Sequence, residues 1–412
     1  MRWRIALPLF ASAALVLGQY TPDPKLEPWI VLHDPATDQV VKATGGLTAY
    51  QTPNLPLRID TNYGNTREDV EPYGGVKPYK RFFLTQMEYT GPGRAIPEPG
   101  PDLKSVKLGF IGPIMSTVSV ATGGKSHEEA LGINMLRGAR LAIEEANARG
   151  GYLKRKIPFE LVTRNDNGLW GASGNEIVRM AYRDPVWAIL GTIDGANSHI
   201  AIRVALKAEL VMMNSGDTDP TFIETNIPWV MRCIGDDRQM GYLLIDYMIR
   251  KMDHRRIGII RSSNRYGRFG VREVRDSARL VKLLREEAFP GVVAGGPLFG
   301  RASFAGQAGT AAEGALFPWV GEPASAFRRS FAQRFGSQPD YAAACAYDSV
   351  HVVVAAIRKA GLNRARIRDA IAALPPYEGA SGHIEWDEFG QNRRPPLLAV
   401  IRSGQVVPAP PR

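Results

Sequence analysis

Strands and helices alternate along most of the chain, as the spacing of its apolar residues indicates. Short apolar runs typical of buried strands begin at Val106 ("VKLGFIGP"), Ile157 ("IPFELVTRNDN"), Val186 ("VWAILG") and Leu210 ("LVMMNSG"). Between the first two, apolar residues recur at helical spacing over 127–151, a segment that ends in two glycines. Strands that alternate with helices predict an α/β fold, with a parallel sheet covered by helices on both faces.

The pattern restarts in the second half of the chain. A strand in "WVMRCIG" is followed by a helix in "DRQMGYLLIDYMIRKM", and further strands are predicted in "RRIGIIRS" and "GVVAGG". Short strands in "GHIEWD" and "LLAVIRSG" close the sequence. Before them the periodicity predicts three helices, at about 323–336, 341–360 and 364–373. This repetition predicts two α/β lobes.

The N-terminal part of the chain follows a different pattern. Residues 1–19 combine a basic start, "MRWR", with the apolar run "IALPLFASAALVLG", which predicts a cleaved signal peptide; an uncleaved anchor is the alternative. Residues 20–102 are rich in proline and glycine, which interrupt helices and central strands, yet they also carry several aromatic residues. We expect an irregular arm that packs partly on the lobes, in an exported protein without stable membrane insertion after signal cleavage.

Charge and composition narrow the chemistry. The net charge of +10 comes from scattered Lys and Arg, without the basic stripe or docking motif of a nucleic-acid-binding protein. The six His and two Cys lack metal-ligand spacing, so no metal or other cofactor is expected, and Cys233 and Cys345 are predicted to be separate buried thiols rather than a disulfide. No nucleophile motif is present. An enzyme using Asp166, Asp194 and Asp217 as acid and base is a weaker alternative.

Polar residues follow two neighbouring predicted strands at the point where each ends. Ligands of parallel α/β sheets bind beyond the carboxyl ends of the strands. "GTIDGANS" and "NSGDTDP" each precede a helix or helical turn, whose free N–H groups suit a carboxylate, while Asp194 and Asp217 suit an ammonium. Ordinary caps and turns are the alternative for each residue. The candidate ligand-binding residues of these loops are Thr192, Asp194, Gly195, Asn197, Ser198, Asn214, Asp217 and Thr218.

The chain from Val106 to Gly404 resembles type I periplasmic binding proteins of branched-chain amino acid and amide ABC importers. The resemblance rests on the two loops together with these segments, which occur in the same order: "NDN", "GARLAIEEANARGG", "VMRCIGDDRQMGYLL", "RIGIIRSSNRYGRFG" and "SGHIEWDEFGQ". The resemblance implies two Rossmann-like lobes that close on a small-molecule ligand, which an importer permease then receives. It implies that the two loops hold the ligand's carboxylate and ammonium and that Tyr266 reaches in from the second lobe. The expected division is 103–232 plus 322–375 for lobe I and 233–321 plus 376–404 for lobe II.

Three departures from the family pattern bear on function. Gly195 stands where relatives often carry Ser, and Leu298 or Phe299 stands where an acidic residue is expected to meet the ammonium. Lobe II lacks about one βαβ unit after Tyr266, and the arm is not standard for the family. These departures favour an amide, an organic acid or a more apolar ligand. A ligand-sensing subunit for a membrane receptor, or a degenerate protein that no longer clamps, is the alternative function.

Overall fold

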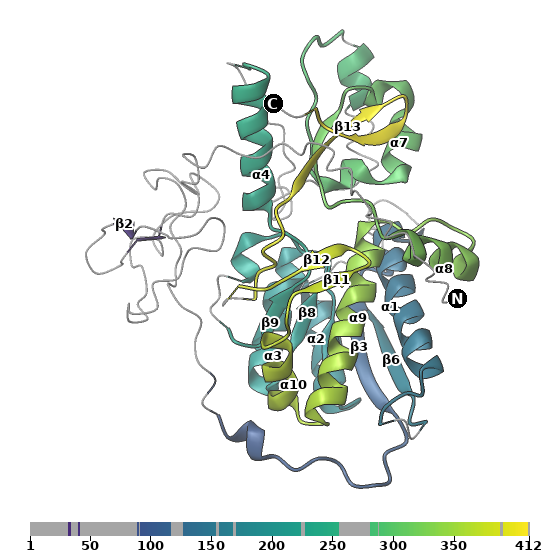
Figure 1. The fold of residues 1–412 in the computed structure, drawn as a ribbon, viewed down its shortest axis with the longest axis vertical. Coiled ribbons are helices and arrows are strands. Elements are labelled where there is room, and N and C mark those ends of the chain that lie inside the picture. Colours follow the sequence, from purple (N-terminus) through teal and green to yellow (C-terminus); the bar gives the residue numbers. More distant parts are fainter. Residues whose placement is uncertain are drawn as a thin grey trace, which may run out of the picture.

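The computed structural model describes residues 32–33, 40–41, 89, 91–116, 127–153, 156–167, 170–223, 227–254, 281–286, 288–387 and 390–410. Most of them belong to two lobes, drawn one above the other in Figure 1. The predicted signal peptide and Tyr266 lie outside the described residues. Within those residues, no helix has the length and apolar character needed to cross a membrane.

Lobe I is built on a five-stranded parallel sheet with the order β6-β3-β7-β8-β9. The strands are β3 (Val106–Gly112), β6 (Phe159–Asn165), β7 (Ile189–Leu190), β8 (Met212–Asn214) and β9 (Val230–Arg232). The predicted parallel α/β sheet is therefore confirmed. Gly112 pairs with Asn165 and Asn214 with Arg232, so the carboxyl ends of the strands lie along one edge.

Helices cover both faces of this sheet (Figure 1). Apolar side chains of α1 (Ala130–Ala148) and α9 (Tyr341–Ala360) pack on one face, and those of α2 (Trp170–Tyr182) and α3 (Gly195–Ala208) on the other. α1 and α9 approach so closely that a Cβ on Gly138 would lie 2.1 Å from the Ala343 carbonyl oxygen. α8 (Ser325–Phe335) and α10 (Arg364–Ala372) complete the three late helices predicted from the sequence.

Lobe II contains a three-stranded antiparallel sheet, β10 (Leu316–Trp319), β13 (Leu397–Arg402) and β14 (Gln405–Pro408). α4 (Asp237–Asp246), which continues as a π-helical turn over Tyr247–Lys251, packs on this sheet through Leu243, Tyr247 and Met248. α7 (Ala302–Ala308) lies in the same lobe (Figure 1). The strand predicted in "GVVAGG" is wrong, because its glycines weaken strand pairing and only a bridge from Ala294 to Leu316 forms.

The shorter elements connect these layers. β11 (Tyr377–Gly379) and β12 (Gly382–Ile384) form a hairpin held on α9, where Asp348 accepts hydrogen bonds from the Ala380 and Ser381 N–H groups at 2.7 Å each. Two further antiparallel pairs are β1 (Leu32–His33) with β2 (Val40–Val41) and β4 (Met115–Ser116) with β5 (His127–Glu128). Short 3₁₀ helices span Pro92–Ala95, Pro220–Phe222, Pro297–Gly300 and Gly309–Ala312.

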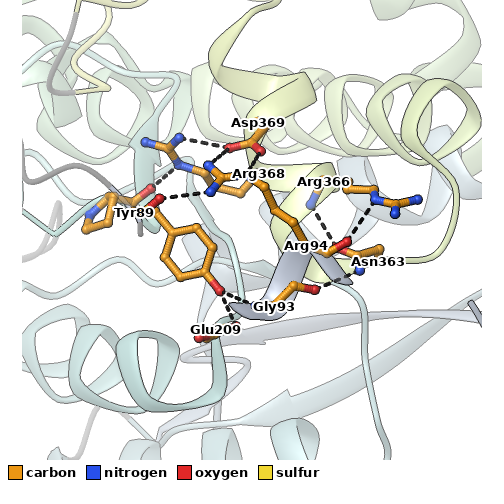
Figure 2. A network of polar contacts seen from close by, with 9 residues as sticks. Tyr89, Gly93, Arg94, Glu209, Asn363, Arg366, Arg368 and Asp369 are labelled. Carbon is orange, nitrogen blue, oxygen red and sulfur yellow. Dashed lines mark hydrogen bonds and ion pairs between the residues drawn. The ribbon is translucent and has the colours of Figure 1, made fainter. Parts of the chain in front are cut away.

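The end of the predicted arm lies against lobe I (Figure 2). The Tyr89 hydroxyl donates to Glu209 Oε2 at 2.5 Å and accepts from the Gly93 N–H at 2.8 Å. Its ring meets Trp229 edge-on, with centroids 4.9 Å apart. Arg94 Nε bonds to Asp369 Oδ2 at 2.6 Å, on α10. Residues 89–94 therefore fasten the arm to α10 and to the C-terminal end of α3.

Removal of the Tyr89 hydroxyl tests this anchor. We expect Tyr89→Phe to lower the free energy of unfolding by about 1–2 kcal/mol, because the change leaves the half-buried Glu209 carboxylate and the buried Gly93 N–H without this partner. Tyr182→Phe is the matched control, since that tyrosine is 59% exposed. Denaturant unfolding measures both variants. Equal stability of the two would show that the anchor contributes nothing.

Candidate functional site

The first candidate loop begins at Gly191, directly after β7. This residue has φ of 110°, and a Cβ here would lie 1.9 Å from the Ile111 carbonyl oxygen, so only glycine fits. The turn places Asp194 at the N-cap of α3, where its Oδ1 accepts from the Ala196 N–H at 2.8 Å. The Ser198 N–H donates to the Asp194 carbonyl at 2.9 Å. Asp194 therefore fills the capping role that the sequence left open.

Four predicted site residues form a buried polar cluster behind this turn. The hydroxyls of Thr192 and Ser198 share a hydrogen bond, and Asn214 Nδ2 donates to Ser198 Oγ at 3.4 Å. Asn197 Nδ2 donates to Asp166 Oδ2 at 3.1 Å. All of these side chains are at most 1% exposed. The structure thus brings together residues from the ends of β6, β7 and β8, and most of their hydrogen-bonding groups already have protein partners.

The second loop is a chain of turns in which each side chain holds the next backbone amide. Asn214 Oδ1 accepts from the Asp217 N–H at 2.8 Å, and Asp217 Oδ1 accepts from the Asp219 N–H at 2.8 Å. Asp219 Oδ1 accepts in turn from the Thr221 N–H at 2.8 Å. The Thr218 carbonyl receives the Asp237 N–H at 2.8 Å, at the start of α4. This loop therefore connects the sheet edge of lobe I to the first helix of lobe II.

Two carboxyl groups of this region titrate unusually. Burial raises the pKa of Asp217 to about 7, the charge of Asp219 adds to the shift, and Arg232 and Ser198 oppose it. Burial also raises the pKa of Asp237 well above its usual range, and Asp219, Asp236 and Asp217 add to that shift. Asp217 and Asp237 are therefore not fully ionised near neutral pH, because both are buried and lie close to other carboxyl groups.

A buried guanidinium joins the second loop to the segments that connect the lobes. Arg232, which is fully buried, donates through Nη1 to the carbonyls of Asp217 at 3.1 Å and Asp219 at 2.7 Å. Its Nε donates to Gln391 Oε1 at 3.0 Å, on the segment between β12 and β13. Asn392 Nδ2 donates to the Cys233 carbonyl at 2.7 Å and strengthens the same junction. A movement of the crossover segments would therefore displace the second loop through the hydrogen bonds of Arg232.

The departures noted in the sequence have structural explanations. Leu298 and Phe299 are 6% and 4% exposed, and Phe299 stacks on Phe304 with centroids 4.0 Å apart. Both side chains pack in the hydrophobic core.

Cys233 and Cys345 are free and buried, as predicted, and burial raises the pKa of Cys345 to about 12. Within the described segments, no group of three or more His, Cys, Asp or Glu is placed to hold a metal ion.

Sequence reasoning missed two contributors to this region. The sequence pattern predicts Asp219 only as part of a turn, although the spacing "DTD" puts its side chain two residues after Asp217. It predicts Arg232 only as part of a strand, and the signal for its role is a charged residue within the apolar run "WVMRCIG". Both residues lie where the loop, α3 and the crossover segments meet.

Comparison with known proteins now identifies the family. The profile described as "Periplasmic binding protein" matches residues 105–291 and 280–405, which is most of the chain. The chain belongs to this family. Its members are binding proteins without enzymatic activity, and the weaker enzyme alternative is therefore wrong for this chain. The candidate loops lie within the first matched segment.

Solved structures share the fold of this family member. The branched-chain amino acid transporter substrate binding protein LivJ from Streptococcus pneumoniae, in complex with isoleucine, superposes with a TM-score of 0.65 at 18% identity, over 74% of this chain and 100% of LivJ. The leucine binding protein LivK from Thermotoga maritima gives a TM-score of 0.64 at 20% identity, over 74% and 97%. At these identities the likeness shows the fold alone, an α/β fold like that of type I periplasmic binding proteins.

Curated relatives match more weakly. An amino acid binding protein of Pseudomonas aeruginosa is 27% identical over 198 residues, which is 47% of this chain and 48% of the relative. The Leu/Ile/Val-binding protein BraC3 of Rhizobium johnstonii is 23% identical over 164 residues, 40% of this chain and 41% of the relative. The match thus spans about half the length of these relatives.

Proposed function

We propose that this chain is an exported, periplasmic solute-binding protein that captures a small amino-acid-like, amide or organic-acid ligand between its lobes and delivers it to an ABC importer permease. The observation that carries the proposal is the position of the loops 191–198 and 214–219 at the carboxyl edge of the lobe I sheet. This is the edge at which parallel α/β sheets bind ligands. The family membership supports the same conclusion.

The proposed mechanism is closure about the crossover segments. A ligand that contacts both lobes shifts the population from open to closed, to the extent that it binds the closed state better. The Arg232–Gln391 bonds lie where such a hinge would bend. From lobe II, Tyr266 is the proposed closing contact, and a lobe II shortened by one βαβ unit would supply few others. Residues 1–19 are proposed to be the signal peptide.

A thermal-shift screen tests the proposal. We expect the purified protein without residues 1–19 to melt at a higher temperature with one small ligand from a panel of amino acids, amides and short organic acids, because a ligand that binds only the folded state stabilises it. Small-angle scattering should then show a smaller radius of gyration with that ligand. A panel without a single stabilising compound would contradict the proposal.

A ligand-sensing subunit is the second candidate, and its partner distinguishes it. A transport protein should bind a permease in its ligand-loaded form, whereas a sensor should bind the extracytoplasmic part of a receptor. Pull-down of each candidate partner with loaded and unloaded protein decides between them. A degenerate protein that does not clamp would show no change in scattering with ligand.

A further inference from the structure

The N-terminus of α3 is already surrounded by carboxylates of the protein itself. A Cβ on Gly195, the first residue of α3, would lie 2.6 Å from Asp219 Oδ2, so this carboxylate lies directly against the helix end. The adjacent His199 Nε2 lies 3.8 Å from the same oxygen. Gly195 therefore leaves room for Asp219, and a serine at this position would collide with it.

Other acids occupy the remaining sides of the same helix end. Asp194 uses its Oδ1 on the Ala196 N–H, and buried Asp166 accepts from Asn197 in the first turn. A helix N-terminus favours an anion, but here the protein supplies that anion. An incoming ligand carboxylate would meet the carboxyl groups of Asp219, Asp194 and Asp166 around the start of α3, and like charges at short range disfavour its binding.

A second observation concerns the neighbouring Asp217. Its side chain is 2% exposed, and Oδ1 accepts from the Asp219 N–H. Oδ2 has no hydrogen-bond partner within the part of the chain that the structure describes. A buried carboxylate oxygen without a donor is costly. The Thr218 side chain, 8% exposed, stands beside it. An ammonium group of a ligand carries three N–H donors and a positive charge, so it matches both the Asp217 carboxylate oxygen and the Thr218 hydroxyl.

We infer that this site selects its ligand through a cationic group held at Asp217 and Asp219, and that it rejects a carboxylate at the N-terminus of α3. The inference rests on the proposed function and narrows it, within that range, to amines and amino-acid amides instead of free amino acids or organic acids. The cation is an organic ammonium, since the carboxylate and hydroxyl acceptors here match its N–H donors.

Calorimetry with four probes of equal apolar size tests whether the site binds an ammonium group and rejects a carboxylate. The probes are isopentylamine (amine only), leucinamide (amine with a neutral amide), leucine (amine and carboxylate) and 4-methylpentanoate (carboxylate only). We expect leucinamide and isopentylamine to bind at least tenfold more tightly than leucine, and 4-methylpentanoate not to bind. Leucine binding as tightly as leucinamide, detectable binding of 4-methylpentanoate, or stabilisation by calcium or magnesium chloride in place of the amines would overturn the inference.

The variant Asp219→Asn separates charge from shape. Asn keeps the Oδ1 acceptor for Thr221 and the bulk beside Gly195, so the turn is preserved. We expect isopentylamine to bind at least tenfold more weakly and leucine to bind more tightly than in wild type, with an unchanged melting temperature without ligand. Asp217→Asn should weaken amine binding similarly. Glu322→Gln, at a carboxylate that is 55% exposed and paired with Arg328, is the control and should change neither affinity.

The two hypotheses fail in different ways. If leucine or 4-methylpentanoate binds well, the proposed function stands and the charge inference falls. If no probe and no compound of the thermal-shift panel binds wild type or either variant, both fall. A panel hit that carries a carboxylate and no amine would overturn the charge inference by itself.

Discussion

Arg232→Met is expected to lower the free energy of unfolding by about 3–5 kcal/mol. Methionine matches the apolar stem of arginine but leaves the carbonyls of Asp217 and Asp219 and the Gln391 side chain without their donors. Breaking a buried, hydrogen-bonded charge by removing one partner typically costs this much. Denaturant unfolding at pH 7 measures the change, with Arg334→Met as control, because Arg334 is 54% exposed and its ion pair with Glu144 lies on the surface.

The lysine variant adds a test of geometry. Arg232→Lys keeps the positive charge but lacks the planar fork that reaches two carbonyls and one amide at once. We expect a loss of stability smaller than that of Arg232→Met and well above that of the control. If Arg232→Met costs no more than the surface control, the guanidinium does not hold the loop, and the proposed link between hinge and site is wrong.

Apolar spacing was sufficient to predict the elements of lobe I. The runs at Val106, Ile157, Val186 and Leu210 became neighbouring parallel strands because each has a buried apolar face to pack against a helix. The same reasoning failed at "GVVAGG", where Val293 is buried but three of the six residues are glycines, and only a single bridge from Ala294 to Leu316 forms. Periodicity therefore predicts elements well where burial is continuous and poorly where glycine dominates.

The sequence predicted the position of the two candidate loops on the sheet, but it did not predict which groups their side chains contact. Strand ends followed by polar residues located the two loops, since chain order alone fixes which ends of parallel strands meet. The partners of those side chains depend on tertiary packing that no local pattern encodes. Asn197 bonds to Asp166 from a strand 31 positions earlier, and Asp219 reaches Gly195 from the next loop. The sequence could not show that the protein's own carboxylates fill the helix end.

Asp217 gives the protein a specific dependence of stability on pH. Its pKa is about 7 in the folded state against an ordinary value of 3.8, so the folded protein holds a proton that the unfolded chain releases between roughly pH 4 and pH 7. The folded state binds more protons in that window, and stability therefore falls as pH rises, by up to about 1.4 kcal/mol per pH unit from this group. Above pH 7 the Asp217 carboxyl is ionised in both the folded and the unfolded state, and the stability that its bound proton contributes is lost.

Asp217→Asn should remove this slope. Unfolding free energies measured from pH 4.5 to pH 8 are expected to show wild type losing stability relative to Asp217→Asn as pH rises, with the difference levelling off above pH 7. The comparison is made against the variant because other groups act in the same range. Burial lowers the pKa of His351 to about 4, which opposes the trend, and the raised pKa of Asp237 reinforces it. Asp219 and Arg232 face position 217 in wild type and in Asp217→Asn alike. They therefore do not by themselves produce the difference between the two pH profiles. Parallel profiles for wild type and Asp217→Asn would show that Asp217 is already ionised at pH 4.5, and its buried carboxylate would then need a partner other than the proton.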